Sequence, residues 1–65
     1  MQDRLKLLVH EMFDKGIRLE DAREEFERHY IDRALEATDG SLTRAATLLG
    51  VHRNTLARKL AERRR

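Results

Sequence analysis

The sequence predicts an all-α domain of four helices, and three observations lead to that prediction. The 65 residues include no proline and only three glycines, and 40% of them are charged. Apolar residues recur three and four positions apart, which is the period of a helix with one buried face. The glycines fall between the periodic segments, where helices end. A chain of this length forms one domain at most, so we assign residues 1–65 to a single unit.

The first predicted helix covers residues 3–15. Its apolar residues form one continuous stripe, made of Leu5, Leu8, Val9, Met12 and Phe13. Gly16 follows the stripe and is expected to end the helix, because glycine readily adopts the left-handed conformation found after a helix C-terminus.

The second predicted helix covers residues 20–38, and its acidic first turn lies near the positive end of the helix dipole. Ile31 and Leu35 extend its apolar surface to a second side. A helix that is apolar on two sides can pack both on its own chain and on a second copy. The stripe expected to face inward is Ala22, Phe26, Tyr30, Ala34 and Ala37.

Two short helices are predicted after the Asp39-Gly40 turn. Ser41 is a good N-cap for a third helix over residues 42–49, which Gly50 ends. The fourth helix is predicted over residues 53–63, and its inward-facing residues are Leu56, Ala57 and Leu60.

The junction between these two helices has the residue types of a helix-turn-helix. Such a corner needs a small residue where the helices touch, a residue that tolerates positive φ, and an apolar plug on the second helix. Ala46, Gly50 and Leu56 occupy these three places. Supporting apolar positions are expected at Ala45, Leu49 and Val51. We therefore predict a helix-turn-helix over residues 41–63. An ordinary helical hairpin is the alternative, and it would not need the polar outer surface of the fourth helix.

That outer surface carries Arg53, Asn54, Arg58 and Lys59, with Thr55 in the first turn. Arginine and asparagine are the side chains that read guanine and adenine edges in the major groove, and lysine and threonine commonly hold phosphates. The fourth helix is therefore the predicted DNA-reading element.

Charge is divided unevenly along the chain. Residues 1–40 carry seven Lys or Arg against eleven Asp or Glu, a net −4, whereas residues 41–65 carry seven against one, a net +6. A polyanion is thus expected to meet the C-terminal segment and to be repelled by the N-terminal one. A solvated basic tail is the alternative for the last three arginines alone.

Neither a metal site nor an enzyme is expected. There is no cysteine, and no two of His10, His29 and His52 lie three or four positions apart on one helix. The charged residues at 23–28 are interpreted as a solvated helix face with ion pairs four positions apart. We therefore expect no cofactor, no metal and no catalytic residue.

The segments Phe26-Glu-Arg-His-Tyr-Ile-Asp-Arg-Ala-Leu35, Thr43-Arg44-Ala45-Ala46, Leu49-Gly50-Val51 and Arg53-Asn54-Thr55-Leu56 resemble the Fis-type helix-turn-helix. This module occurs in a bacterial nucleoid protein and at the C-terminus of NtrC-type transcriptional activators. The resemblance implies a four-helix subunit and an intertwined homodimer, held by the helices of residues 3–38, that binds and bends duplex DNA. It assigns DNA contacts to Ser41, Thr43, Arg44, His52, Arg53, Asn54, Thr55, Arg58 and Lys59.

Two residues depart from the family pattern. His52 stands where a Ser or Asn cap is usual, which is expected to weaken the start of the fourth helix unless the imidazole contacts DNA. Ala57 occupies a position that is basic in the nucleoid protein, so one phosphate contact is expected to be missing. If Met1 is a natural start, the resemblance implies a minimal stand-alone regulator; otherwise the chain is an excised C-terminal domain.

A homodimer is also expected because so short a chain buries little surface by itself and has no disulfide or metal to stabilise it. The apolar stripe of residues 5–13 can fold back on its own chain or clasp a second one, and we favour the second arrangement. The predicted dimer interface consists of Leu5, Leu8, Val9, Met12, Phe13, Phe26, Tyr30 and Ile31.

The predicted function is sequence-tolerant DNA binding and bending, in transcription regulation or nucleoid organisation, in a cytoplasmic bacterial protein. The alternative is a helical interaction module that recruits a partner, such as RNA polymerase or another protein, through its acidic N-terminal helices. RNA binding is the least favoured of the three hypotheses, because the sequence offers no aromatic surface on which single-stranded bases could stack. No membrane partner is expected, since no apolar run approaches the ~20 residues of a membrane span.

Overall fold

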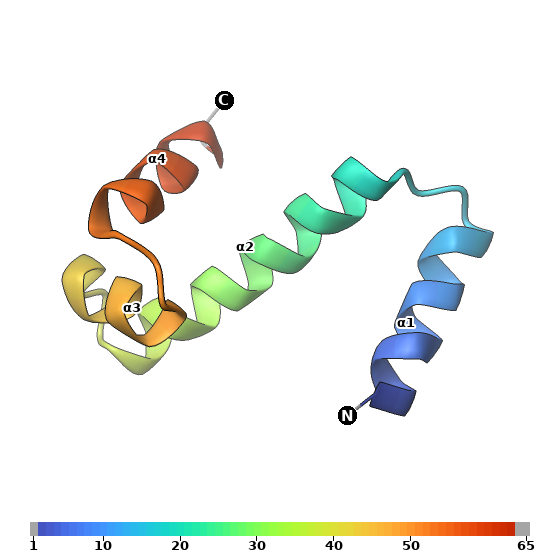
Figure 1. Cartoon of the computed structure of the whole chain (residues 1–65), viewed down its shortest axis with the longest axis horizontal. Helices are drawn as coiled ribbons and strands as arrows, with labels where there is room; N and C mark the ends of the chain where they lie inside the picture. Colours follow the sequence, from blue (N-terminus) through green and yellow to red (C-terminus); the bar gives the residue numbers. More distant parts are fainter. Residues whose placement is uncertain (1, 64–65) are drawn as a thin grey trace.

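The computed structural model describes residues 2–63, which form four helices: α1 (Gln2–Asp14), α2 (Leu19–Ala37), α3 (Leu42–Leu49) and α4 (Arg53–Arg63). The long helix α2 joins two parts of the molecule, with α1 beside its N-terminal end and α3 and α4 gathered at its C-terminal end (Figure 1). Residues 2–63 contain no strand. The predicted all-α class is confirmed: α3 and α4 have the predicted bounds, and α1 and α2 each lie one residue earlier than predicted.

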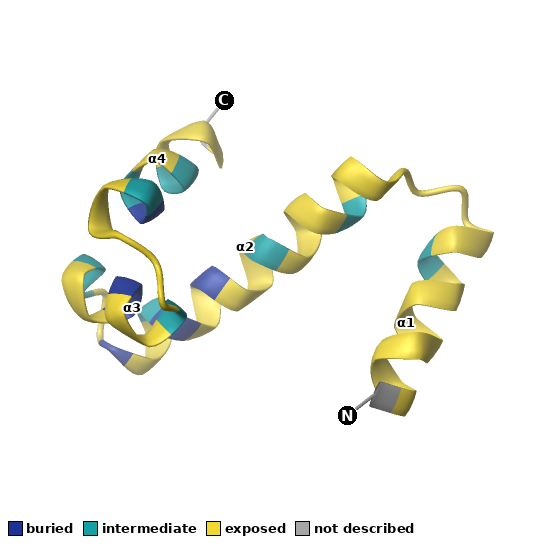
Figure 2. Cartoon of the chain, viewed as in Figure 1, coloured by how far each residue is buried: buried dark blue, intermediate teal, exposed yellow. Residues whose placement is uncertain are grey.

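The core is small and lies where α3 and α4 pack on the C-terminal half of α2 (Figure 2). Leu56 of α4 is fully buried and is the only large side chain described that reaches that state. Alanines surround it, so the helix backbones can approach closely. The buried apolar residues are Ile31, Ala34, Ala45, Ala46 and Leu56, with Leu35, Leu42, Leu49 and Leu60 partly buried against them.

The turn between α2 and α3 ends one helix and positions the next. Asp39 and Gly40 both have positive φ, at 54° and 84°. This reversal lets the Gly40 amide donate to the Leu35 carbonyl at 2.8 Å and the Asp39 amide to the Glu36 carbonyl at 3.4 Å, which satisfies two carbonyls at the end of α2. The Asp39-Gly40 turn is therefore confirmed.

Thr38 is the one buried polar side chain among the described residues, and it joins the same turn to the core. Its hydroxyl lies 3.0 Å from the Ala34 carbonyl oxygen and 3.2 Å from the Ser41 carbonyl oxygen. A buried hydroxyl without partners would be costly, so these bonds favour a fixed angle between α2 and α3.

The buried side of α2 differs from the predicted inner stripe. Ile31, Ala34 and Thr38 recur at helical spacing and face α3 and α4, whereas Phe26 and Tyr30 remain 53% and 59% exposed. Ala34 is the single member of the predicted stripe that is buried. The prediction that α2 is apolar on two sides is correct, but it placed the core on the side of Phe26 and Tyr30 instead of the side of Ile31. The sequence does not indicate on which side of α2 the helix α3 packs.

Two individual predictions need correction. Ile31 was expected in the dimer interface, but only 6% of it is exposed, because it lies in the core of its own chain. Val51 was expected to support the helix corner, yet it is 37% exposed. Its backbone amide donates to the Ala46 carbonyl at 3.0 Å, which ties the corner to α3.

None of the helices formed by residues 2–63 combines the length and apolar character needed to cross a membrane.

Candidate nucleic-acid interface

The helix-turn-helix is built from the three residues that the sequence singled out. Ala46 is buried at the contact, Leu56 is buried beneath α4, and Gly50 has φ 73° at the corner. In that conformation the Gly50 amide donates to the Thr47 carbonyl at 3.2 Å. A side chain at position 50 would meet no neighbour within 4 Å, so the glycine is needed for its backbone conformation alone.

The start of α3 presents Thr43 and Arg44 to solvent. Ser41 caps the helix as predicted, since its Oγ accepts a hydrogen bond from the Arg44 amide at 3.3 Å. Thr43 and Arg44 are exposed, and the Arg44 guanidinium is free to reach a phosphate beside the N-terminus of the helix.

His52 caps the start of α4 with its side chain, which corrects the expectation of a weakened helix start. The Asn54 amide donates to His52 Nδ1 at 3.1 Å, the bond that a Ser or Asn oxygen would otherwise accept. A ring nitrogen accepts a hydrogen bond only when it carries no proton, so the cap requires Nδ1 to be unprotonated.

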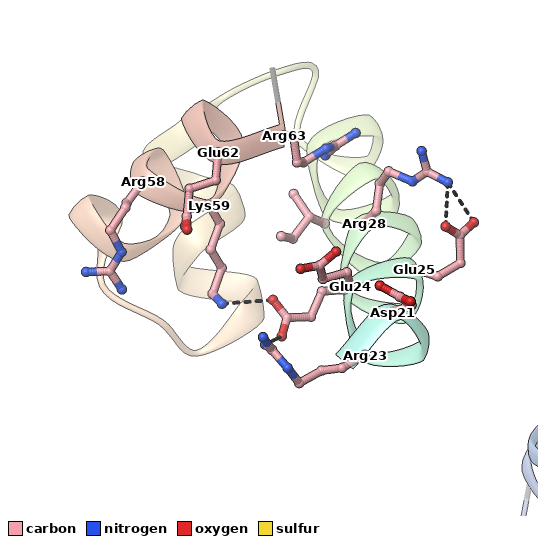
Figure 3. Close-up of a pocket in the computed structure, with 11 residues that line it drawn as sticks. Asp21, Arg23, Glu24, Glu25, Arg28, Arg58, Lys59, Glu62 and Arg63 are labelled. Atoms are coloured by element: carbon pink, nitrogen blue, oxygen red, sulfur yellow. Dashed lines mark hydrogen bonds and ion pairs between the residues drawn. The ribbon is translucent and has the colours of Figure 1, made fainter. Parts of the chain in front are cut away.

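The outer face of α4 carries Arg53, Asn54 and Arg58, which are all exposed. Thr55 and Ala57 lie at the edges of this face and are half-buried. In Figure 3 the Arg58 side chain extends away from α2. These side chains can therefore enter a groove without displacing the core.

Lys59 does not share this face. Its Nζ donates to Glu27 Oε1 of α2 at 2.8 Å, and 31% of each side chain is exposed. Figure 3 shows the Lys59 ammonium directed across to α2. The hydrogen bond from Lys59 lowers the pKa of the Glu27 carboxyl, helped by Arg23 and opposed by partial desolvation. The predicted grouping of Lys59 with the outer residues of α4 is thus wrong.

A second ion pair links the end of α4 to α2. Arg63 donates from Nη1 to Asp32 Oδ1 at 2.9 Å and from Nη2 to Oδ2 at 3.4 Å. Between the two helices lies a charged groove of about 720 Å³, lined by residues of both signs, including Arg28, Arg58 and Glu62 (Figure 3). Sequence reasoning missed the roles of Glu27 and Asp32, because partners 31 and 32 positions apart leave no local signal.

Three of the five acidic side chains in the N-terminal half of α2 are paired within the chain. Arg23 pairs with both Glu20 and Glu27, and Glu25 accepts from Arg28 at 2.6 Å and lies 3.1 Å from His29 Nε2. Hydrogen bonds from the arginines lower the pKa values of the Glu20 and Glu25 carboxyls. The expected spacing of four residues is found between Arg23 and Glu27, but Arg28 pairs with Glu25, three positions away, and not with Glu24 as expected.

A separate, apolar groove of about 760 Å³ lies between α1 and α2. The rings of Phe26 and Tyr30 stand 5.6 Å apart along one wall. The opposite wall comes from α1, whose apolar residues are exposed or half-buried; Phe13 beside the groove is 78% exposed. Apart from Phe13 and Ile31, all predicted interface residues line this groove: Leu5, Leu8, Val9, Met12, Phe26 and Tyr30.

Comparison with known proteins identifies one family. The model of the family described as "Bacterial regulatory protein, Fis family" matches residues 22–62, which is more than half of the chain. The match runs from the first turn of α2 through the helix-turn-helix, and it includes Glu27 and Asp32, the acidic residues of the two ion pairs between α2 and α4. Neither the curated proteins nor the solved structures gave a match.

Proposed function

Since the chain belongs to the Fis family of bacterial regulatory proteins, whose helix-turn-helix binds DNA, we propose that two copies of it bind and bend one duplex. Each copy inserts α4 into a major groove. The single observation that carries this proposal is the outer face of α4, where Arg53, Asn54 and Arg58 project from a helix anchored by Leu56.

The proposed DNA surface combines base-reading and phosphate-holding groups. Arg53 and Asn54 lie in the first turn of α4, and the first turn of the recognition helix is the part that contacts base edges in this class of motif. Arg44 and Arg58 flank them and are placed to hold phosphates on either side. The complete proposed set is Ser41, Thr43, Arg44, His52, Arg53, Asn54, Thr55 and Arg58, without Lys59.

The dimer proposal is supported by the apolar groove between α1 and α2. A monomeric protein rarely exposes so continuous an apolar surface, and here aromatic and aliphatic side chains line it on both helices. A second copy offers the same stripe and is therefore a self-complementary occupant, as in two-fold symmetric dimers. In this dimer α1 and α2 of both copies form one shared core.

Bending follows if the dimer holds its two recognition helices closer together than one turn of straight duplex, about 34 Å. A duplex that must contact both helices then curves toward the protein, and easily deformed sequences are favoured. Such a protein tolerates many sequences, which suits regulation at several sites or organisation of the nucleoid.

Salt-dependent binding tests the assignment of α4. Arg58→Gln should weaken binding to every duplex and flatten the slope of log K against log salt by roughly 0.9 per subunit, because one phosphate contact is lost. Arg18→Gln is the matched control: it removes the same charge at the far end of α2, where Arg18 makes no capping hydrogen bond. Equal effects of the two changes would overturn the assignment. Fluorescence anisotropy with labelled duplexes gives the slopes.

Protein recruitment through the acidic helices has less support. The carboxylates of Glu20, Glu25 and Glu27 are engaged by basic side chains of the same chain. An incoming basic partner would have to displace those bonds, so DNA is the better-supported partner.

A further inference from the structure

The recognition helix is attached to the rest of the chain at two kinds of contact. Leu56 lies in the core and Leu60 is partly buried against it. Beyond Leu60, Ala61 and Glu62 are exposed, and the remaining links to α2 are the ion pairs of Lys59 and Arg63. The apolar contacts hold α4 near its middle, and the ion pairs hold its C-terminal half.

Leu56 and Leu60, one turn apart, give α4 apolar contacts with the core, and the ion pairs of Lys59 and Arg63 add two polar contacts with α2. Lys59 and Arg63 lie about one helical turn apart on one side of α4, and Glu27 and Asp32 lie about 1.4 turns apart on α2. Fixing both points determines the rotation of α4 and its tilt against α2.

Glu27 is itself held in place from the other side. Its Oε1 accepts from Lys59, and its Oε2 accepts from Arg23, which also bonds Glu20. The carboxylate is thereby oriented before Lys59 reaches it, so the rotamer entropy lost on pairing is reduced. This connected chain of four charges distinguishes the pair from an isolated surface ion pair.

We propose that Glu27 and Asp32 are positioning residues for the recognition helix, which act through Lys59 and Arg63 and leave those two cations outside the DNA contact. The inference rests on the proposed function. In a dimer joined through α2, any change in the angle between α2 and α4 displaces both recognition helices relative to each other. Selectivity between duplexes depends on both helices fitting at once, so it should depend on Glu27.

A double-mutant cycle on duplex selectivity tests the positioning role of Glu27. Selectivity is the ratio of affinities for a duplex selected from a random pool and for a scrambled duplex of equal length. Glu27→Gln and Lys59→Met should each lower this ratio about two- to fivefold per subunit, the range expected for one partly exposed ion pair. The double variant should lose no more than either single variant. Glu24→Gln, which removes a carboxylate from the same helix, is the control and should leave the ratio unchanged.

Other outcomes would overturn the inference. If Glu27 only repels DNA, Glu27→Gln would raise affinity for both duplexes alike. If Lys59 contacts a phosphate, Lys59→Met would flatten the slope of log K against log salt as Arg58→Gln does. The fold-losses of selectivity from Glu27→Gln and Lys59→Met would then multiply in the double variant. Melting curves confirm that each variant is folded before the ratios are compared. If the unaltered protein bound no duplex, the proposed function would be contradicted. If it bound DNA but the selectivity losses of Glu27→Gln and Lys59→Met were additive, only the positioning role would be contradicted.

Discussion

At the C-terminal end of α2, the chain covers its own apolar side chains, and at the N-terminal end it leaves them open. Ile31 of α2 and Leu56 of α4 are buried in one core, whereas Phe26 and Tyr30, five residues and one residue before Ile31, lie on another side of α2 and line an open groove with α1. Both sides of α2 are similarly apolar in sequence. The difference shows that the chain itself covers the apolar side chains of the helix-turn-helix, whereas it leaves those between α1 and α2 uncovered.

The largest effect is expected from a charge placed in the open groove. Leu8→Asp would put a carboxylate into the proposed dimer core at a cost of about 4 kcal/mol or more, since a buried charge without a partner is strongly unfavourable. The dimer should then dissociate at micromolar concentration, and α1 should lose helicity because a short helix alone is marginal in water. Sedimentation and circular dichroism measure both changes. A variant that still sediments as a dimer would contradict the proposed interface.

In the core formed by α2, α3 and α4, the next largest effect is expected from shortening Leu56. Leu56→Ala is expected to lower the free energy of unfolding by about 2–4 kcal/mol, because it leaves a cavity in a core otherwise made mainly of alanines. Leu48→Ala is the control, since Leu48 is exposed on α3, and it should change stability by less than about 0.5 kcal/mol. Equal melting temperatures for the two variants in thermal denaturation would show that the core is not where we place it.

A smaller effect at the closed end concerns the cap of α4. His52→Ala should destabilise the chain by about 1 kcal/mol, because the Asn54 amide loses its acceptor. His52→Asn supplies a side-chain oxygen for the same amide and should recover most of the loss. Chemical denaturation monitored by helical signal compares the three proteins. No recovery with asparagine would mean that the imidazole acts otherwise than as a cap.

The smallest effect should come from acid, through the ion pairs on α2. The pKa values of Glu20, Glu25 and Glu27 are lowered in the folded chain, mainly by hydrogen bonds from Arg23, Arg28 and Lys59 respectively. A lowered folded pKa adds stability above the ordinary value of 4.5, and that stability is lost as pH falls through the folded values. The melting temperature of the unaltered protein should therefore approach that of Glu27→Gln as the pH is taken below 4.5. A difference that stays constant down to strongly acidic pH would contradict these pairs.

Much of the candidate site could be predicted from local sequence. Ser41 and Gly50 set the ends of α3 through bonds within a few residues, so the bounds of α3 and α4 matched their prediction. His52 stands at the cap position of α4, where the sequence predicts a weakened helix start because Ser, Thr, Asp and Asn are the preferred caps; the structure shows instead that its Nδ1 accepts the capping bond. The bond spans only two residues, so the sequence carried the signal.

By itself the sequence determined the four helices, the left-handed corner at Gly50 and the family, because each depends on neighbours within about one or two turns or on a contiguous pattern. Only the tertiary structure decided that Ile31 rather than Tyr30 enters the core, and that Lys59 binds Glu27 instead of joining Arg58 on the outer face. Both outcomes depend on the angle at which α3 and α4 return to α2. Pairs of residues 30 or more positions apart meet only after that angle is fixed, so periodicity along the chain cannot reveal them.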